Sequence, residues 1–159
     1  MSRGGRERPD SRPLHLQLPA ILIVMGGGAL GTLCRYLLNT AIPTPDGWPL
    51  PTLIINLGGA FALGLLLEAL ARRGPDVGAR RTLRLLAGTG FLGAFTTYST
   101  LALDANLLLA ADRIADAVAF MLVSAIGGLV TGAAGVWVAA ARRAAVGPEN
   151  AAGAETDLK

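Results

Sequence analysis

Charged and aromatic residues are scarce in this chain of 159 residues. Charged residues make up 16% of it, against about 25% in soluble domains, whereas 52% of the residues are hydrophobic. These values exclude an ordinary soluble domain, whose surface needs more polar side chains, and a disordered chain, which is poor in apolar residues. A single cysteine, Cys34, excludes an internal disulfide and a cysteine-based zinc cluster. A single histidine, His15, leaves little material for histidine chemistry.

Long apolar stretches dominate what remains. There are four of them, at residues 18–42, 50–70, 85–111 and 114–141. Each is long enough to cross a hydrocarbon core about 30 Å thick, and a backbone in lipid must satisfy its own hydrogen bonds, so we expect helices. The sequence therefore predicts an all-α integral membrane protein with one four-helix domain, at residues 14–145. Residues 1–13 (basic) and 146–159 are predicted to be disordered tails.

Arginine is distributed unevenly over the predicted loops. With four spans, both tails and the second loop lie on the same side of the membrane, and they contain eleven arginines. The third loop lies on the opposite side and contains one. The eleven are Arg3, Arg6, Arg8, Arg12, Arg72, Arg73, Arg80, Arg81, Arg84, Arg142 and Arg143, and the one is Arg113. By the positive-inside rule, both termini are predicted to be cytoplasmic, in a multi-pass protein of the plasma membrane. This distribution does not indicate nucleic-acid binding.

A few polar residues lie inside the apolar stretches, where each needs a partner or a water-filled path. Arg35 is either an arginine that reaches the membrane interface or a cation that attracts anions to a pore mouth. Asn56 is either a structural amide between helices or a neutral donor to a desolvated anion. Glu68 precedes Arg72 by four residues, which favours an ion pair on a helix surface.

The third stretch contains the run Thr-Thr-Tyr-Ser-Thr at residues 96–100. Hydroxyl side chains compete for backbone hydrogen bonds, and β-branched residues lose rotamer freedom in a helix. The run therefore predicts a helix that is broken near the middle of the membrane, where freed carbonyls bind a cation and hydroxyls face an anion. The alternative is a continuous helix whose hydroxyls bond back to its own carbonyls. Asp104 follows one turn later.

Segments from all four stretches resemble the motifs of one family. Residues 27–36 (GGALGTLCRY) resemble its GGxxGxxxRY pattern, and residues 51–61 (PTLIINLGGAF) resemble GTLxxNxxGxF. Residues 90–100 (GFLGAFTTYST) are similar to GFxGGFTTFST, and Ser124 with Gly128 and Leu129 matches the fourth helix. The family that these segments resemble is that of the Fluc (CrcB-type) fluoride channels.

The resemblance implies an antiparallel dimer with two fluoride pores and a structural Na⁺ at its centre. The carbonyls that hold Na⁺ correspond to Gly93 and Thr96. The anion path corresponds to Asn56, Arg35, Tyr98, Ser99, Thr100 and Ser124, and Thr131 shares the helix face of Ser124. Tyr98 and Leu101 stand where the family has two phenylalanines, Asp104 where it has glutamate, and Phe120 where tyrosine is common. Since leucine has no aromatic edge to meet an anion, the two pores of one polypeptide need not be equivalent.

We therefore expect passive fluoride export rather than enzymatic activity; there is no Walker A pattern to bind a nucleotide. The alternative is a proton-coupled small-molecule exporter that uses Asp104 or Glu68. A third class, a non-transporting assembly subunit, leaves the polar run without a role. The arginine bias opposes the even split of orientations that an antiparallel homodimer needs. It favours a heterodimer with an oppositely oriented homologous chain, and a homodimer is the alternative.

Overall fold

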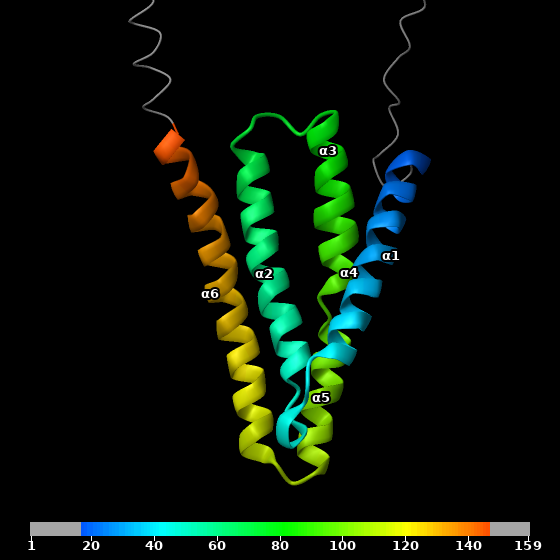
Figure 1. Cartoon of the computed structure of the whole chain (residues 1–159), viewed down its shortest axis with the longest axis vertical. Helices are drawn as coiled ribbons and strands as arrows, with labels where there is room; N and C mark the ends of the chain where they lie inside the picture. The colour runs from blue at the N-terminus through cyan, green and yellow to red at the C-terminus, as the bar shows by residue number, and fades with distance from the viewer. Residues whose placement is uncertain (1–16, 147–159) are drawn as a thin grey trace, which may run out of the picture.

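Helices make up nearly all of the computed structural model, which describes residues 17–146. The predicted tails, apart from Val146, fall outside the described residues. The elements are α1 (Leu18–Ala41), η2 (Pro45–Gly47), α2 (Leu50–Ala71), α3 (Ala79–Leu83), η3 (Arg84–Leu92), α4 (Gly93–Phe95), α5 (Tyr98–Ala110) and α6 (Ile114–Val146). No strand occurs in this part of the chain, so the all-helical prediction is confirmed (Figure 1).

Three helices are long and apolar enough to cross a membrane: Leu18–Ala41, Leu50–Ala71 and Ile114–Arg142. The third predicted stretch is divided among η3, α4 and α5. η3 is a nine-residue π-helix, a wide form that is rare and usually limited to a single turn. α6 continues to Val146, beyond the predicted boundary at residue 141, because alanines, the strongest helix formers, surround Arg142 and Arg143.

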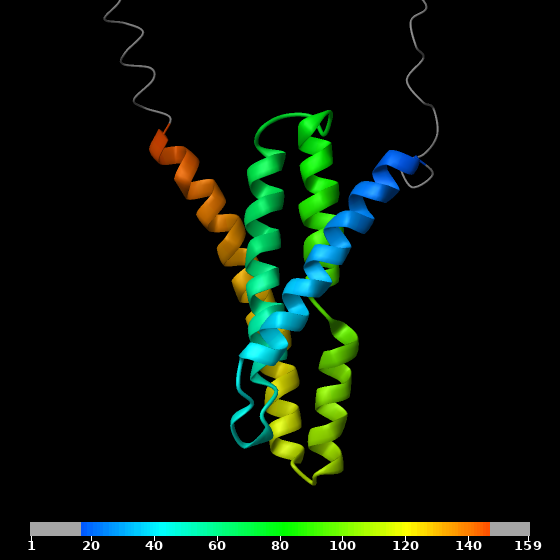
Figure 2. The ribbon, with the colours of Figure 1, turned by 45° about the vertical axis from the view of Figure 1, so that its right-hand side comes forward.

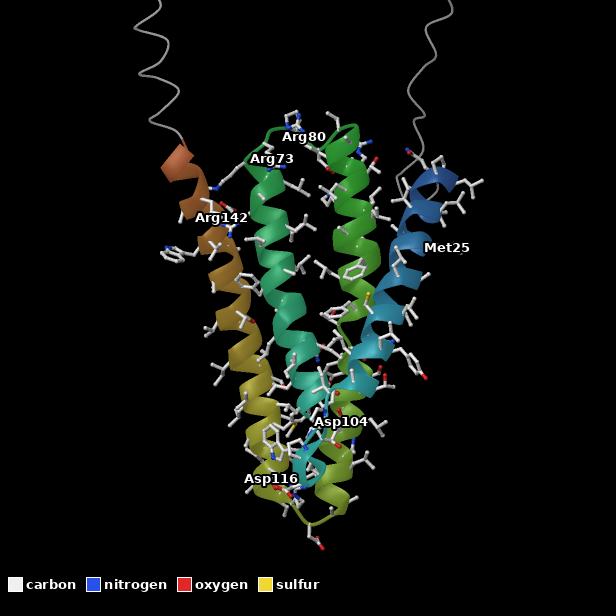
Figure 3. All side chains as sticks on the ribbon, viewed as in Figure 1. Met25, Arg73, Arg80, Asp104, Asp116 and Arg142 are labelled. Carbon is white, nitrogen blue, oxygen red and sulfur yellow. The ribbon has the colours of Figure 1, made fainter. Side chains whose placement is uncertain are left out.

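The helices run roughly along one direction, and the connections lie at the two ends (Figures 1 and 2). The start of α1, the loop between α2 and α3 and the end of α6 lie at one end. The loop with η2 and the turn before α6 lie at the other. Figure 3 places Arg73, Arg80 and Arg142 at the first end and Asp116 at the second. We call them the arginine end and the acidic end.

Glycines bring two pairs of helices into backbone contact. A Cβ added to Gly64 of α2 would lie within 3 Å of the Gly132 carbonyl of α6, and one added to Gly135 would meet Phe61 in the same way. In the other pair, a Cβ on Gly27 of α1 would overlap the Leu86 carbonyl of η3. Small residues therefore set the separation of these helices, as expected for membrane helices.

A small core closes the acidic end. Phe120 of α6 is fully buried, and its ring packs edge-on against Trp48, with ring centroids 6.0 Å apart. Arg113 donates from Nε to the Asp116 carboxylate (2.7 Å) and from Nη1 to the Asp46 carbonyl (2.6 Å). The loop that contains η2 is thus tied to the start of α6. Away from this core, large apolar side chains on every long helix are exposed, as is expected of a surface that faces lipid or another chain.

Candidate functional site

An interruption between α4 and α5 organises the candidate site. α4 ends at Phe95 and α5 begins at Tyr98. Between them, Thr96 (φ −76°, ψ 152°) and Thr97 (φ −147°, ψ 119°) have extended backbones. The interruption falls within the hydroxyl run, where side chains compete with the helix for backbone hydrogen bonds.

Asn56 of α2 holds the extended backbone with its side-chain amide. Its Nδ2 donates to the Thr97 carbonyl (3.0 Å), and its Oδ1 accepts from the Thr97 N–H (2.8 Å). In an uninterrupted helix this N–H would bond to the carbonyl of Gly93, four residues earlier. Asn56 thus takes the usual donor away from Gly93. The amide is a link between helices, as the first interpretation of Asn56 required.

The Thr97 hydroxyl is a second centre of hydrogen bonds. Its Oγ1 caps α5 by accepting from the Thr100 N–H (3.2 Å), and it lies 3.0 Å from Thr100 Oγ1 and 3.2 Å from Ser99 Oγ. In a continuous helix the Thr100 N–H would donate to the Thr96 carbonyl. Two carbonyls at the interruption, those of Gly93 and Thr96, therefore lose their helical donors to side chains.

A pocket of about 220 Å³ lies beside the interruption. Arg35 of α1, Thr52 of α2, and Thr97 and Thr100 line it, with further residues of α1 and α2. Arg35 is half-buried, so its charge faces a space shared with hydroxyl groups. Of the predicted polar positions, Arg35 and Thr100 line this volume, and Asn56 hydrogen-bonds to the backbone of Thr97, which also lines it.

Two carboxylates, which the alternative function would use, have different surroundings. Asp104 is half-buried, and its Oδ2 accepts a hydrogen bond from Thr52 Oγ1 at 2.6 Å. Glu68 pairs with Arg72 at the arginine end, which confirms the predicted ion pair. Only Asp104 therefore lies near the pocket, through Thr52.

Other predicted residues lie apart from this cluster. Tyr98 is 82% exposed, and Ser99 and Gly93 are also exposed. Ser124 lies on α6 with a buried Oγ that has no hydrogen-bond partner among the described residues. Thr131 bonds back to the Gly128 carbonyl of its own helix. These candidate residues therefore do not line the pocket that one chain builds.

Sequence reasoning did not single out Thr97 or Thr52. Both belong to the matched segments, but their roles depend on which groups lie opposite them: the Thr100 N–H for Thr97 and the Asp104 carboxylate for Thr52. One sequence signal could have indicated Thr97. Threonine is a preferred residue at the position just before a helix begins, where its hydroxyl accepts from a backbone N–H of the first turn.

Comparisons with known proteins agree with the resemblance. The family model described as CrcB-like protein, Camphor Resistance (CrcB), matches residues 22–136. The chain is 46% identical over 134 residues to "Fluoride-specific ion channel FluC 2" of Leifsonia xyli subsp. xyli, covering 84% of this chain and 92% of the relative. It is 44% identical over 130 residues to "Fluoride-specific ion channel FluC 1" of Cutibacterium acnes (81% and 85%), and 40% identical over 132 residues to "Fluoride-specific ion channel FluC 2" of Nocardia farcinica (79% and 92%). The chain therefore belongs to the CrcB-like family.

Proposed function

We propose that this chain is a fluoride-specific ion channel that lowers cytoplasmic fluoride by passive export. One observation carries the proposal: the polar residues of the family segments, Asn56, Thr97 and Thr100, meet around a helix interruption beside Arg35. Relatives that match this chain over most of their length bear the name of that activity. A channel of this kind carries out no enzymatic reaction.

The chemistry of the pocket suits a small, strongly hydrated anion. Fluoride gives up water only where other donors replace it, and the Asn56 amide has a second N–H beyond the one that bonds to Thr97. Hydroxyls of Ser99, Thr100 and Ser124 are neutral donors, and Arg35 attracts an anion without closing the path. An inside-negative potential then expels the anion with about 2.3 kcal/mol per 100 mV, so no nucleotide is needed.

The exposure of Tyr98 and Ser99 supports a second subunit that lines the other side of the anion path. Tyr98 and Ser99 are part of the matched signature, yet one chain leaves them uncovered. We propose that an oppositely oriented second subunit covers them, and that two pores result. The helix interruption would then lie near mid-membrane, where a non-helical backbone is stable only when protein or a cavity covers it.

The residues present fit a structural Na⁺. Gly93 and Thr96 offer carbonyl oxygens whose helical donors are bonded to Asn56 and Thr97 instead, and carbonyl oxygens replace the hydration shell of alkali ions. Two carbonyls are few for a complete site, so a second subunit would supply the others. The ion would offset the crowding of carbonyl dipoles at the interface, while Asn56 and the Thr97 hydroxyl keep the usual helical donors of these carbonyls engaged elsewhere.

We further propose that the arginine end is cytoplasmic, in a multi-pass protein of the plasma membrane. Since a chain with this bias inserts in one orientation, its antiparallel partner is a homologous chain of opposite bias. Leu101 is consistent with two unequal pores. A homologous partner with an aromatic residue at the corresponding position would supply the aromatic edge to one pore, which leucine cannot do for the other. The alternative is an antiparallel homodimer of this chain.

A fluoride electrode tests the function directly. Purified protein, alone or with the homologous chain of the same organism, is reconstituted into vesicles loaded with potassium fluoride, and valinomycin sets the potential. We expect fluoride efflux driven by voltage alone, and no efflux when chloride replaces fluoride. Efflux of both anions, or of neither with both chains present, would overturn the proposal.

The same vesicles test the proton-coupled alternative, which the half-buried Asp104 favours. If Asp104 carries protons, transport of a substrate will follow an imposed pH gradient at zero potential, and Asp104→Asn will abolish that response. Transport that follows voltage, at equal pH on both sides, excludes this alternative.

A further inference from the structure

An apolar groove lies between the first half of α1 and η3. Its volume is about 450 Å³, and its lining includes Ala20, Ile21, Val24 and Met25 from α1, with Leu85 and Arg84 opposite. Both ribbon views show α1 and the helix of α3 and η3 spreading apart toward the arginine end (Figures 1 and 2). The groove therefore opens toward the end that contains most of the described arginines.

Backbone contacts close the groove below. A Cβ on Gly27 would overlap the Leu86 carbonyl, and one on Gly90 would lie 2.7 Å from the Val24 carbonyl. Above this contact the groove is open to the side, since Ile21 and Met25 are 39% and 63% exposed. A long, narrow apolar molecule that enters from the side would thus end at the glycine contact.

Arg84 is the charged group of the groove. Its Nε and Nη2 contact the same oxygen of Asp76, at 3.0 and 2.7 Å. This hydrogen bond holds the pKa of the Asp76 carboxyl below its usual range, so the carboxyl is ionised at neutral pH. A guanidinium has five N–H donors in a planar fork. The pair with one carboxylate oxygen therefore leaves donors for a second anion.

The surroundings of Arg84 are strongly basic. Residues 68–84 contain five arginines against two acids, Glu68 and Asp76. Arg80 and Arg81 donate to the backbone carbonyls of Arg73 and Asp76, which fixes their side chains at this end without cancelling their charge. Each basic residue near a surface contributes about 1 kcal/mol to the attraction of anionic lipid.

We propose that this groove is a binding site for one anionic phospholipid, with the phosphate against Arg84 and an acyl chain along Ile21, Val24 and Met25. The apolar walls accept an acyl chain of any phospholipid, but only an anionic headgroup complements the excess of arginine. Basic pockets between membrane helices bind anionic headgroups for the same reason.

Lipid binding to the purified, detergent-solubilised protein tests the site. The probes are phosphatidylglycerol and phosphatidylcholine with identical chains, and native mass spectrometry measures the dissociation constant of each. Arg84→Gln is expected to weaken phosphatidylglycerol binding about fivefold, the equivalent of about 1 kcal/mol, and to leave phosphatidylcholine unchanged. Asp76→Asn removes the competing carboxylate and should strengthen phosphatidylglycerol binding, which a loss of structure would not do.

Two further variants address the groove and the general charge. Val24→Trp fills the groove and should weaken both lipids, and Ala20→Leu does so more mildly if the tryptophan prevents folding. Arg142→Gln is the matched control, because Arg142 lies at the same end but on α6 (Figure 3), and it should weaken phosphatidylglycerol binding clearly less than Arg84→Gln does.

Three results would overturn the proposal. Equal loss of phosphatidylglycerol binding in Arg84→Gln and Arg142→Gln would show attraction by the general charge alone. Competition by inorganic phosphate at the same concentration as the lipid would indicate a site for a free anion. Dissociation of a dimer by Val24→Trp or Ala20→Leu, with lipid binding intact, would make the groove a subunit interface.

Discussion

Asn56 makes the contact on which the candidate site depends. Its amide bonds to both polar groups of the Thr97 backbone, so it fixes the interruption and also stands at the edge of the proposed anion path. A substitution there acts on backbone geometry and on charge at once. The two effects are separated by the choice of variant and control.

Asn56→Asp is expected to abolish fluoride efflux. The carboxylate still accepts from the Thr97 N–H, but it repels the Thr97 carbonyl and places a negative charge beside the anion path. Since the side-chain volume barely changes, the protein should still fold and elute normally from a sizing column. Electrode-detected efflux from vesicles is the measurement.

Asn106→Asp is the matched control for that variant. Asn106 is exposed on α5 and, within residues 17–146, donates to the Ala102 carbonyl of its own helix, so the same chemical change there should leave efflux within about twofold of wild type. Undiminished efflux in Asn56→Asp would remove Asn56 from the path.

Among the elements, α2 and α6 are held at backbone contact by glycine. A Cβ at Gly64 would overlap the Gly132 carbonyl, whereas one at Gly58 on the same helix meets nothing within 4 Å. Gly64→Ala is therefore expected to destabilise the protein by about 1–3 kcal/mol, the usual cost of overpacking. Gly58→Ala should not. Thermal unfolding in detergent compares the two, and equal melting temperatures would argue against this packing.

Gly93 lies in regular helix just before the interruption. Its dihedrals are ordinary helical values (φ −63°, ψ −33°), and an added Cβ meets only the Gly88 carbonyl, at 3.9 Å. Within one chain, therefore, neither a bend nor close packing requires glycine here. A need for glycine at this position would have to come from the proposed second subunit.

Gly93→Val thus tests the dimer rather than the fold of the chain. We expect normal helix content by circular dichroism, with easier dissociation of the dimer in detergent. Thr96→Ser should dissociate like wild type, because it keeps the carbonyl. If Gly93→Val and wild type dissociate alike, the proposed ion between subunits has no support.

The helices themselves followed from the length of the apolar stretches, and the unsuitability of the hydroxyl run for a continuous helix predicted a break in the third. The nine-residue π-helix did not follow, because residues 84–92 contain no proline or other local signal for it. The hydrogen bond from the Thr97 N–H to Asn56 could not be predicted either, because Asn56 lies 41 residues earlier in the chain and is opposite Thr97 only in the folded structure. The sequence indicates local helix preference, whereas the hydrogen-bond partner of a backbone N–H released from a helix depends on the tertiary structure.

For the molecule as a whole, the two ends differ in charge. By the loops and helix ends to which they belong, the arginine end contains Arg72, Arg73, Arg80, Arg81, Arg84 and Arg142 with Glu68 and Asp76, and the acidic end contains Asp46, Asp112, Asp116 and Arg113. Arg113 bonds to Asp116 and to the backbone of Asp46, so its charge is partly compensated where it lies.

Cysteine labelling tests the predicted single orientation. Cys34 is first replaced by Ala, and single cysteines are then placed at Thr44 and Val77, in the loops at opposite ends. An impermeant maleimide applied to cells should label Thr44→Cys and spare Val77→Cys. Fluoride resistance of the cells should require the second chain. Balanced labelling of both positions, with full resistance from this chain alone, would establish a homodimer.

The unequal ends also have an electrical consequence. With the termini in the cytoplasm, as proposed, an inside-negative membrane holds the excess arginines on its negative side and the excess acids on its positive side. Turning the chain over would move every one of these charges against the field, at about 2.3 kcal/mol for each charge and each 100 mV. The voltage that drives fluoride out would thus also stabilise the orientation of the chain. An antiparallel partner gains the same stabilisation only if its own charges are distributed the other way round.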